Sequence, residues 1–224
     1  MLGFLSVDNI AFTVLGYPMS YVELLGTILY LWSVWLIARR RVLTWPVGIM
    51  SVLLFMALFY QIRLYADAFE QIYYLFASVY GWLHWSKSTS SSDQGVIVRY
   101  SGRTEMLRWV LGTCILAIAV GVLISRLHLL LPLVFPEAAS FPFLDALTTV
   151  MSFTAMWLLA RRRIESWIYW IIVDAIGIWL YFVKDVRFVS LLYVILLAMA
   201  INGLLSWTKA AAQAKSTSAT ATLH

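Results

Sequence analysis

The chain consists mostly of apolar runs that are each long enough to cross a lipid bilayer as a helix. A membrane-spanning helix needs about 20 predominantly apolar residues. The sequence contains seven runs of this kind, at 21–38, 44–62, 65–85, 105–124, 142–160, 166–183 and 188–207. Only 12% of the residues are charged, whereas a soluble domain carries about 25%. The sequence therefore predicts an all-α integral membrane protein with seven transmembrane helices, in contact with membrane lipid.

The first and last parts of this helical region repeat each other in sequence. A shift of 122 residues, from Glu23 to Asp145, lays residues 23–85 over residues 145–207 without a gap. The first repeat contains the heptapeptide Trp-Leu-Ile-Ala-Arg-Arg-Arg, and the second contains Trp-Leu-Leu-Ala-Arg-Arg-Arg at the equivalent place. Four further tryptophans coincide in pairs, Trp45 with Trp167 and Trp85 with Trp207. The chain is therefore expected to contain two three-helix repeats.

A single linking helix sets the relative orientation of the two repeats. With the helix at 105–124 between them, both repeats enter the membrane from the same side. This gives seven transmembrane helices in a 3+1+3 arrangement of two parallel three-helix repeats. Parallel repeats related by an axis along the membrane normal are a transporter pattern, with a substrate site near the bilayer midplane. The alternative is an old gene duplication that is retained only for packing.

Composition divides the chain into five segments. Residues 1–20 are mixed in character and form an amphipathic N-terminal lead-in in this interpretation. The first repeat occupies 21–86 and the second occupies 142–208. Between them, residues 87–141 hold a polar linker, the linking helix and an interfacial segment. The tail at 209–224 is rich in Ala, Ser and Thr, and we expect it to be disordered.

The positively charged residues mark one side of the membrane. Clusters of Lys and Arg follow the first, third, fifth and seventh helices, at 39–41, 87–103, 161–163 and 209–215. Under alternating topology these clusters share one side, which the positive-inside rule makes cytoplasmic. The N-terminus is then outside and the C-terminus inside. The formal net charge of +5 follows from these topology signals, so we expect no nucleic-acid partner.

The run at 166–183 carries an acidic residue at its centre. Trp167, Trp170 and Asp174 are spaced i, i+3 and i+7 and therefore share one face of a helix. A lone carboxylate near the middle of a membrane helix costs roughly 2.5 kcal/mol or more unless it is shielded. Two indoles beside an acid suit a flat, polar, cationic ligand. The alternative is that Trp167 belongs to an interfacial belt, which explains a tryptophan but not a deeper acid.

A second set of polar residues comes from the helix at 65–85. Under the repeat, its Gln71 is equivalent to Tyr193, and its Tyr80 is equivalent to Asn202. One asymmetric site can draw on this helix and on the last two helices. The candidate substrate-binding residues are therefore Trp45, Gln71, Tyr74, Trp167, Trp170, Asp174, Tyr193 and Asn202.

The sequence carries no motif that points to catalysis. Cys114 stands alone in an apolar run, and no Cys/His cluster suggests a metal site. A Gly-rich phosphate loop and a Walker lysine are both missing from the sequence. We therefore expect no enzyme activity, no catalytic residue, no metal and no cofactor, with a small molecule as the partner.

Several of these motifs together resemble the nicotinamide riboside transporters called PnuC. The matching segments are 35–40, 45–49, 59–67, 71–74 and 80–82 in the first half, and 167–174, Tyr181, Lys184, 192–193 and Gly203 in the second. The resemblance implies a seven-helix fold related to SWEET sugar transporters, a homotrimer, and a place in the bacterial cytoplasmic (inner) membrane. It also implies uptake of the riboside by facilitated diffusion, with phosphorylation by a cytosolic kinase trapping the substrate.

The resemblance also assigns roles to individual residues. It implies that Trp167 and Trp170 sandwich the nicotinamide ring, and that Asp174 and Gln71 hydrogen-bond the substrate. One departure concerns the turn after Lys184, where the family resemblance leads us to expect Gly and the sequence has Asp185.

Three functional alternatives stay open at this point. Related transporters carry thiamine or riboflavin, and Asp174 does not choose between the riboside and thiamine because both are cationic. Glu70 and Asp174 could carry protons, which would make the protein a symporter. A membrane scaffold or sensor could also bind the vitamin without moving it.

Overall fold

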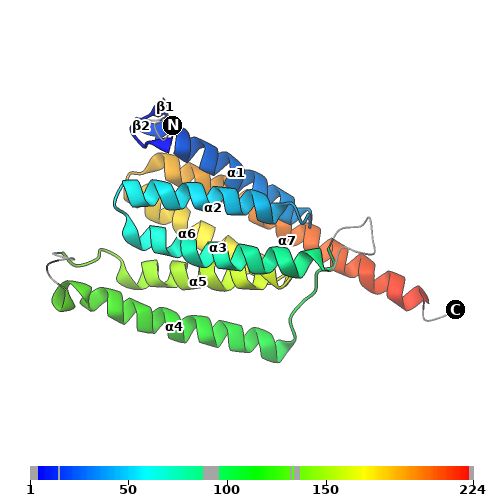
Figure 1. Cartoon of the computed structure of the whole chain (residues 1–224). Coiled ribbons are helices and arrows are strands. Elements are labelled where there is room, and N and C mark those ends of the chain that lie inside the picture. Colours follow the sequence, from blue (N-terminus) through cyan, green and yellow to red (C-terminus); the bar gives the residue numbers. More distant parts are fainter. Residues whose placement is uncertain (1–4, 15, 88–95, 132, 134–136, 222–224) are drawn as a thin grey trace.

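The computed structural model describes residues 5–14, 16–87, 96–131, 133 and 137–221, with side chains up to Ser216. The described part of the chain forms one β-hairpin and seven helices (Figure 1). The elements in order are β1 (Ile10–Val14), β2 (Tyr17–Ser20), α1 (Tyr21–Ala38), α2 (Thr44–Gln61), α3 (Tyr65–Ser86), α4 (Arg103–Leu130), α5 (Pro142–Ala160), α6 (Ser166–Val183) and α7 (Arg187–Ala221). The prediction of seven helices is confirmed.

Six of the seven described helices are long and apolar enough to span a membrane, and α3 is the exception. The polar residues of α3, among them Asp67, Glu70 and Gln71, lower its mean hydropathy. Polar residues in a membrane helix ordinarily face other helices or a water-filled cavity. The helix least suited to lipid is therefore a natural source of groups for a polar site.

The helices pack mainly against their sequence neighbours. In each of the two halves the middle helix contacts both of its neighbours, α2 between α1 and α3, and α6 between α5 and α7. Contacts between α3 and α5 and between α1 and α7 join the halves, while α4 packs against α5 at the edge of the bundle (Figure 1). The two halves are therefore joined mainly through α1, α3, α5 and α7.

The helix boundaries recur at the same shift of 122 residues as the sequence. The first and last residues of α2 (Thr44–Gln61) and of α6 (Ser166–Val183) are equivalent under this shift. The four described non-glycine residues with positive φ also form two equivalent pairs, Arg40 (58°) with Arg162 (62°), and Arg63 (62°) with Asp185 (57°). Asp is one of the residues that tolerate this left-handed conformation. Asp185 therefore supports the turn where a Gly was expected.

Four tryptophans close the end of the bundle that carries the loops 39–41 and 161–163, which we call the arginine end. Trp45, Trp85, Trp167 and Trp207 are all at most 2% exposed and belong to one core cluster. Neighbouring rings lie 5.3–5.9 Å apart between centroids. The two halves also exchange hydrogen bonds here, because Trp85 Nε1 donates to Ala160 O and Trp207 Nε1 donates to Ile37 O, each at 3.0 Å.

At the opposite end, the N-terminal lead-in forms a β-hairpin, which the sequence did not predict. β1 and β2 pair antiparallel. Tyr17 stacks on Phe188 at 5.4 Å and donates a hydrogen bond from its hydroxyl to Glu23 Oε1 at 2.8 Å. Burial and this hydrogen bond raise the pKa of Tyr17, so the hydroxyl stays protonated and can donate. The hairpin is thereby held against the starts of α1 and α7.

Two helices are longer than predicted. α4 begins at Arg103 and ends at Leu130, and α7 continues to Ala221, beyond the bundle at the arginine end (Figure 1). A disordered tail was predicted from residue 209. The described part of that segment is helical instead, because Ala, Gln and Lys at 209–215 are strong helix formers.

Candidate functional site

The centre of the candidate site is Asp174, in the middle of α6. Its side chain is only 4% exposed, and none of the described residues makes a hydrogen bond to its carboxylate. Buried carboxylates ordinarily have partners, because desolvation of a bare charge is costly. An unpartnered acid at mid-membrane depth is therefore a candidate for contact with a ligand.

Two tyrosines from other helices lie near this acid, and a third lies near those two. Tyr30 of α1 and Tyr193 of α7 are close enough to Asp174 to interact with its charge. Tyr74 of α3 interacts with Tyr30 and Tyr193, and lies near Ser152 of α5. The site thus draws on both halves of the chain, and it combines aromatic faces with hydroxyl groups and one carboxylate.

Tyr193 is held in place by close packing. Its ring stacks on Tyr181 with a centroid distance of 5.3 Å and an interplanar angle of 19°. A Cβ added at Gly177 would lie 2.4 Å from the Tyr193 ring, so only glycine fits there. Glycine at this position of α6 lets α7 approach and fixes the Tyr193 ring beside Asp174.

A second acid, Glu70, approaches the same site from α3. Its Oε1 accepts a hydrogen bond from Thr149 Oγ1 of α5 at 3.2 Å. Its charge also reaches Tyr74 and Tyr193. The two acids and the three tyrosines together supply carboxyl groups and aromatic faces, which suit a cation with a flat ring.

The structure places Trp45 and Trp167 in the packed cluster at the arginine end. A Cβ added at Gly81 would lie 2.3 Å from the Trp45 ring, and one at Gly203 would lie 2.5 Å from the Trp167 ring. Each indole is therefore pressed against the backbone of a neighbouring helix. Trp170, one turn along α6, is only partly buried and packs at the junction of two core clusters.

Gln71 and Asn202 are not brought to Asp174 by any contact among the described residues. Gln71 Nε2 lies 3.5 Å from the carbonyl oxygen of Asp67, one turn back on its own helix. Asn202 is exposed on the surface of α7. Of the predicted residues, Asp174, Tyr193 and Tyr74 are the ones that the structure brings together.

Sequence reasoning missed Tyr30 and Ser152, and it considered Glu70 as a proton carrier or as a residue facing a trimer interface or polar cavity, not as a substrate-binding residue. The internal repeat contained a signal for two of them, because the shift of 122 residues lays Tyr30 over Ser152. A polar pair at equivalent positions of two apolar helices is expected to lie at the interface between the repeats. Neither residue stands out when its own helix is read alone.

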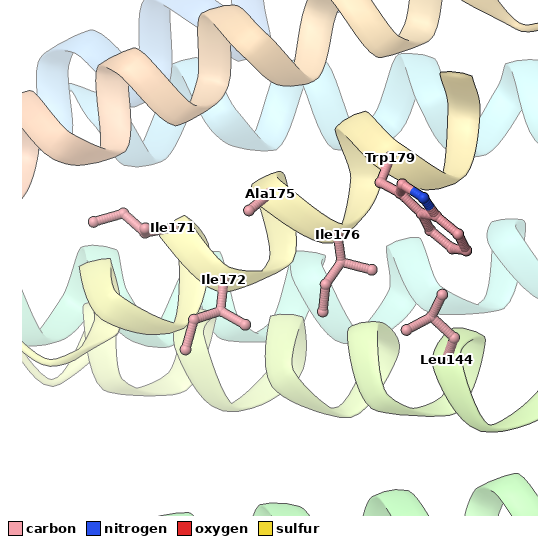
Figure 2. A pocket seen from close by; sticks show the side chains of 6 residues that line it. All are labelled: Leu144, Ile171, Ile172, Ala175, Ile176 and Trp179. Atoms are coloured by element: carbon pink, nitrogen blue, oxygen red, sulfur yellow. The ribbon is translucent and has the colours of Figure 1, made fainter. Parts of the chain in front are cut away.

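A groove on the outer surface of α5 and α6 has a different chemical character. It has a volume of about 410 Å³ and is lined by Leu144 of α5 and by apolar residues and Trp179 of α6 (Figure 2). Its walls offer almost no polar surface. The groove does not suit a polar vitamin.

Comparisons with known proteins show which family this chain resembles. The family model described as "Nicotinamide mononucleotide transporter" matches residues 20–209. The nicotinamide riboside transporter PnuC of Escherichia coli is 31% identical, with 93% of this chain and 95% of the relative covered. The riboflavin/roseoflavin transporter RibM of Streptomyces davaonensis is also 31% identical, over 90% of this chain and 91% of the relative.

A solved structure has the same fold. The crystal structure of the Vitamin B3 transporter PnuC superimposes with a TM-score of 0.67 at 21% identity, covering 86% of this chain and 83% of that chain. The resemblance inferred from the sequence motifs is confirmed by these matches. The chain is a multi-pass membrane protein that belongs to the nicotinamide mononucleotide transporter family.

Proposed function

We propose that this protein takes up nicotinamide riboside by facilitated diffusion. The observation that carries the proposal is Asp174, a buried carboxylate that lies near tyrosines of α1 and α7 and has no hydrogen-bond partner among the described residues. The riboside carries a positive charge on a flat aromatic ring, which matches an acid beside aromatic faces. The 31% identity to a nicotinamide riboside transporter supports this substrate.

The second candidate substrate is a flavin, because RibM matches at the same identity. The two acids favour the riboside. A neutral isoalloxazine ring gains nothing from a charge at Asp174 or Glu70, and must still desolvate both. Uptake of labelled riboside into proteoliposomes, with riboflavin and thiamine as competitors, tests this ranking. We expect unlabelled riboside to compete best, and stronger competition by riboflavin would reassign the substrate.

We propose that α1–α3 and α5–α7 are parallel repeats in a 3+1+3 arrangement, with α4 as the linking helix. Support comes from the coinciding helix boundaries and from the paired left-handed residues. The substrate site then lies between the repeats, which is where parallel-repeat transporters bind their substrates.

We further propose that the riboside is trapped inside by a cytosolic kinase and that the protein works as a homotrimer in a bacterial inner membrane. Trapping is required by the mechanism, because facilitated diffusion only equilibrates the substrate. The support for the trimer is the family resemblance.

The arginine end is expected to face the cytoplasm. The loops 39–41 and 161–163 carry six arginines, and Lys and Arg within about 15–20 residues of a span set its orientation. A reporter fused after Trp207 should therefore be active only in a form that requires the cytoplasm. Activity of a periplasmic reporter at the same position would reverse the topology.

A further inference from the structure

Residues 96–101, between α3 and α4, cross the arginine end as an extended segment that we call the strap. Its first part is anchored by side chains, because Val96 and Val98 are 1% and 4% exposed. Both belong to the core cluster that contains the four tryptophans. The strap is therefore packed into the core cluster that closes the arginine end.

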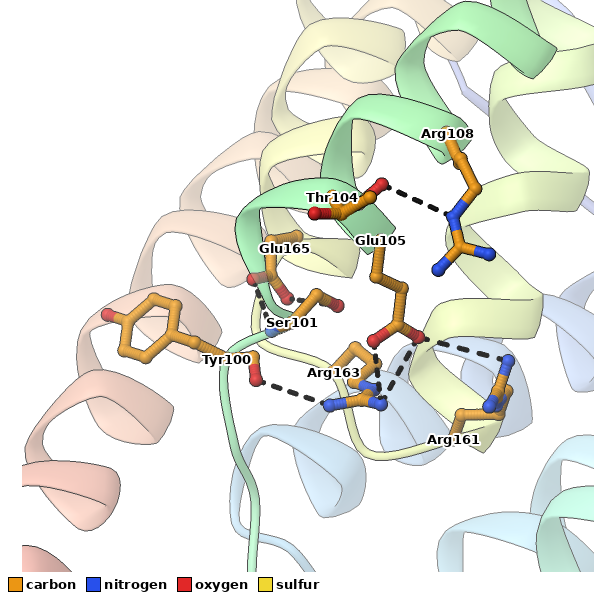
Figure 3. Close-up of polar contacts among 8 residues, drawn as sticks. All are labelled: Tyr100, Ser101, Thr104, Glu105, Arg108, Arg161, Arg163 and Glu165. Carbon is orange, nitrogen blue, oxygen red and sulfur yellow. Dashed lines mark hydrogen bonds and ion pairs between the residues drawn. The ribbon is translucent and has the colours of Figure 1, made fainter.

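The strap is joined to the second half by several polar contacts. Arg99 N donates to Arg162 O at 3.1 Å, and Ile164 N donates to Arg99 O at 3.2 Å. Ser101 N donates to Glu165 Oε1 at 2.7 Å, and Arg163 Nη1 donates to Tyr100 O at 3.2 Å (Figure 3).

The helix that follows the strap is tied to the same half. The Arg163 guanidinium also pairs with Glu105, in the first turn of α4, at 2.9 Å (Figure 3). α4 itself packs against α5. The strap and α4 therefore form one body with the second half.

Polar contact with the first half is sparser, although Val96 and Val98 also pack in the cluster that contains Ile37 and Trp45. Among the described residues, the strap makes one backbone hydrogen bond to the loop 39–41, from Val96 N to Arg40 O at 3.3 Å. Arg40 is the repeat equivalent of Arg162, so the strap bonds the same left-handed turn in both halves. The equivalent contacts differ in polar support, because among the described residues only the one to Arg162 is flanked by side-chain hydrogen bonds to the strap.

The arginine end is closed in this structure. The four tryptophans and both strap valines are almost fully buried, and Ile164 is 0% exposed. A polar substrate bound at Asp174 cannot leave past this cluster unless the halves separate here. Packed interfaces of this kind switch between discrete arrangements rather than deforming continuously.

We propose that the strap is the latch of the gate at the arginine end. The strap stays attached to the second half when the gate opens, and its contact with the first half breaks at Val96. The inference rests on the proposed transport function, because a latch matters only if the end must open. The weakest contact, Val96 to Arg40, is the one that breaks.

A matched pair of crosslinks tests the latch in full-length protein. Cys114 is exposed and is first replaced by Ser. Val96→Cys with Arg41→Cys links the strap to the first half, and Arg99→Cys with Arg163→Cys makes the equivalent link to the second half. Arg99 and Arg163 are bridge partners, and residues paired in this way lie within the Cα separation that a disulfide spans.

Riboside flux is then measured in proteoliposomes before and after oxidation. The first crosslink should lower flux about tenfold or more, because a locked gate limits turnover, and reduction should restore it. The second crosslink should leave flux unchanged relative to its own reduced form. Undiminished flux with the first crosslink closed, or a block by the second alone, would overturn the proposal.

A labelling measurement separates failure of the latch from failure of the proposed substrate. Val96→Cys in the Cys114→Ser background is exposed to a membrane-impermeant maleimide at the arginine end, without ligand. The buried position should become labelled as the gate opens, and reagent should reach it much more slowly than it reaches an exposed cysteine at the same end. If Val96→Cys stays unlabelled the latch is wrong, whereas absent riboside flux with normal labelling would reject only the substrate.

Discussion

Trp207→Ala is expected to lower the free energy of unfolding by about 3–5 kcal/mol, the range for large aromatic residues removed from a core. Trp207 is fully buried between Trp85 and Trp167. Its removal leaves a cavity at the arginine end and takes the donor from Ile37 O. Thermal unfolding of purified protein in detergent should show a clearly lower midpoint than for the unmodified protein.

Two variants separate packing from hydrogen bonding. Trp179→Ala is the control for losing an indole, because Trp179 is 52% exposed on the outer surface of α6. It should shift the midpoint little. Trp207→Phe keeps most of the bulk and loses the Nε1–H donor with a small part of the ring volume, so its cost should be smaller, about 1–3 kcal/mol. Equal midpoints for Trp207→Ala and Trp179→Ala would show that the tryptophan cluster does not hold the halves together.

Asp174→Asn is expected to weaken binding of the cationic riboside by about ten- to a hundredfold. A hydrogen bond or contact to a charged group contributes about 1.5–3 kcal/mol, and 1.4 kcal/mol is a factor of ten in affinity. The neutral reduced riboside should lose much less, because asparagine keeps the size and hydrogen-bonding capacity of the side chain. Calorimetry on monodisperse protein with both ligands makes the comparison.

The second tryptophan of the Trp-x-x-Trp pair is tested in the same titrations. Trp170→Ala should weaken binding of both ligands alike, because stacking on a heterocycle contributes about 1–3 kcal/mol whatever its charge. Trp167→Ala should instead lower stability, since Trp167 is pressed against Gly203 in the core. If Trp170→Ala and Asp174→Asn fold well and bind both ligands normally, α6 does not contribute to the site.

The helices of this fold could be predicted because the bilayer imposes their length. The start of α1 was marked by Ser20, whose hydroxyl accepts a hydrogen bond from Glu23 N at 3.3 Å. Its end was marked by the arginines after Ala38, and the bounds at Tyr21 and Ala38 match the prediction. The repeat was also visible, since four tryptophans and two arginine clusters recur at one spacing.

The strap and the hairpin could not be predicted, because their contacts join segments that are far apart in sequence. Val96 is buried against residues of both halves, yet the sequence around it reads as a polar linker. The hairpin depends on Tyr17 reaching Phe188 at the start of the last helix. The sequence pattern around Val96 or Tyr17 does not indicate either contact.

The candidate site was predicted in part, for a reason that lies in helix geometry. Spacing puts Trp167, Trp170 and Asp174 on one face of α6. These residues span about two turns of the helix, so they need not all contact the same site. Trp167 reaches the tryptophan cluster, whereas Asp174 lies two turns deeper among the tyrosines. Periodicity gives the direction of a side chain and says nothing about how neighbouring helices cover it.

The central claim is that the protein moves nicotinamide riboside across the membrane without coupling it to an ion. Time-resolved uptake of labelled riboside into sealed proteoliposomes that contain no kinase tests it most directly. The account predicts saturable uptake that stops when internal and external concentrations are equal, with the same end point in the presence of a protonophore. Saturable binding without flux, or accumulation above the external concentration that a protonophore abolishes, would contradict it.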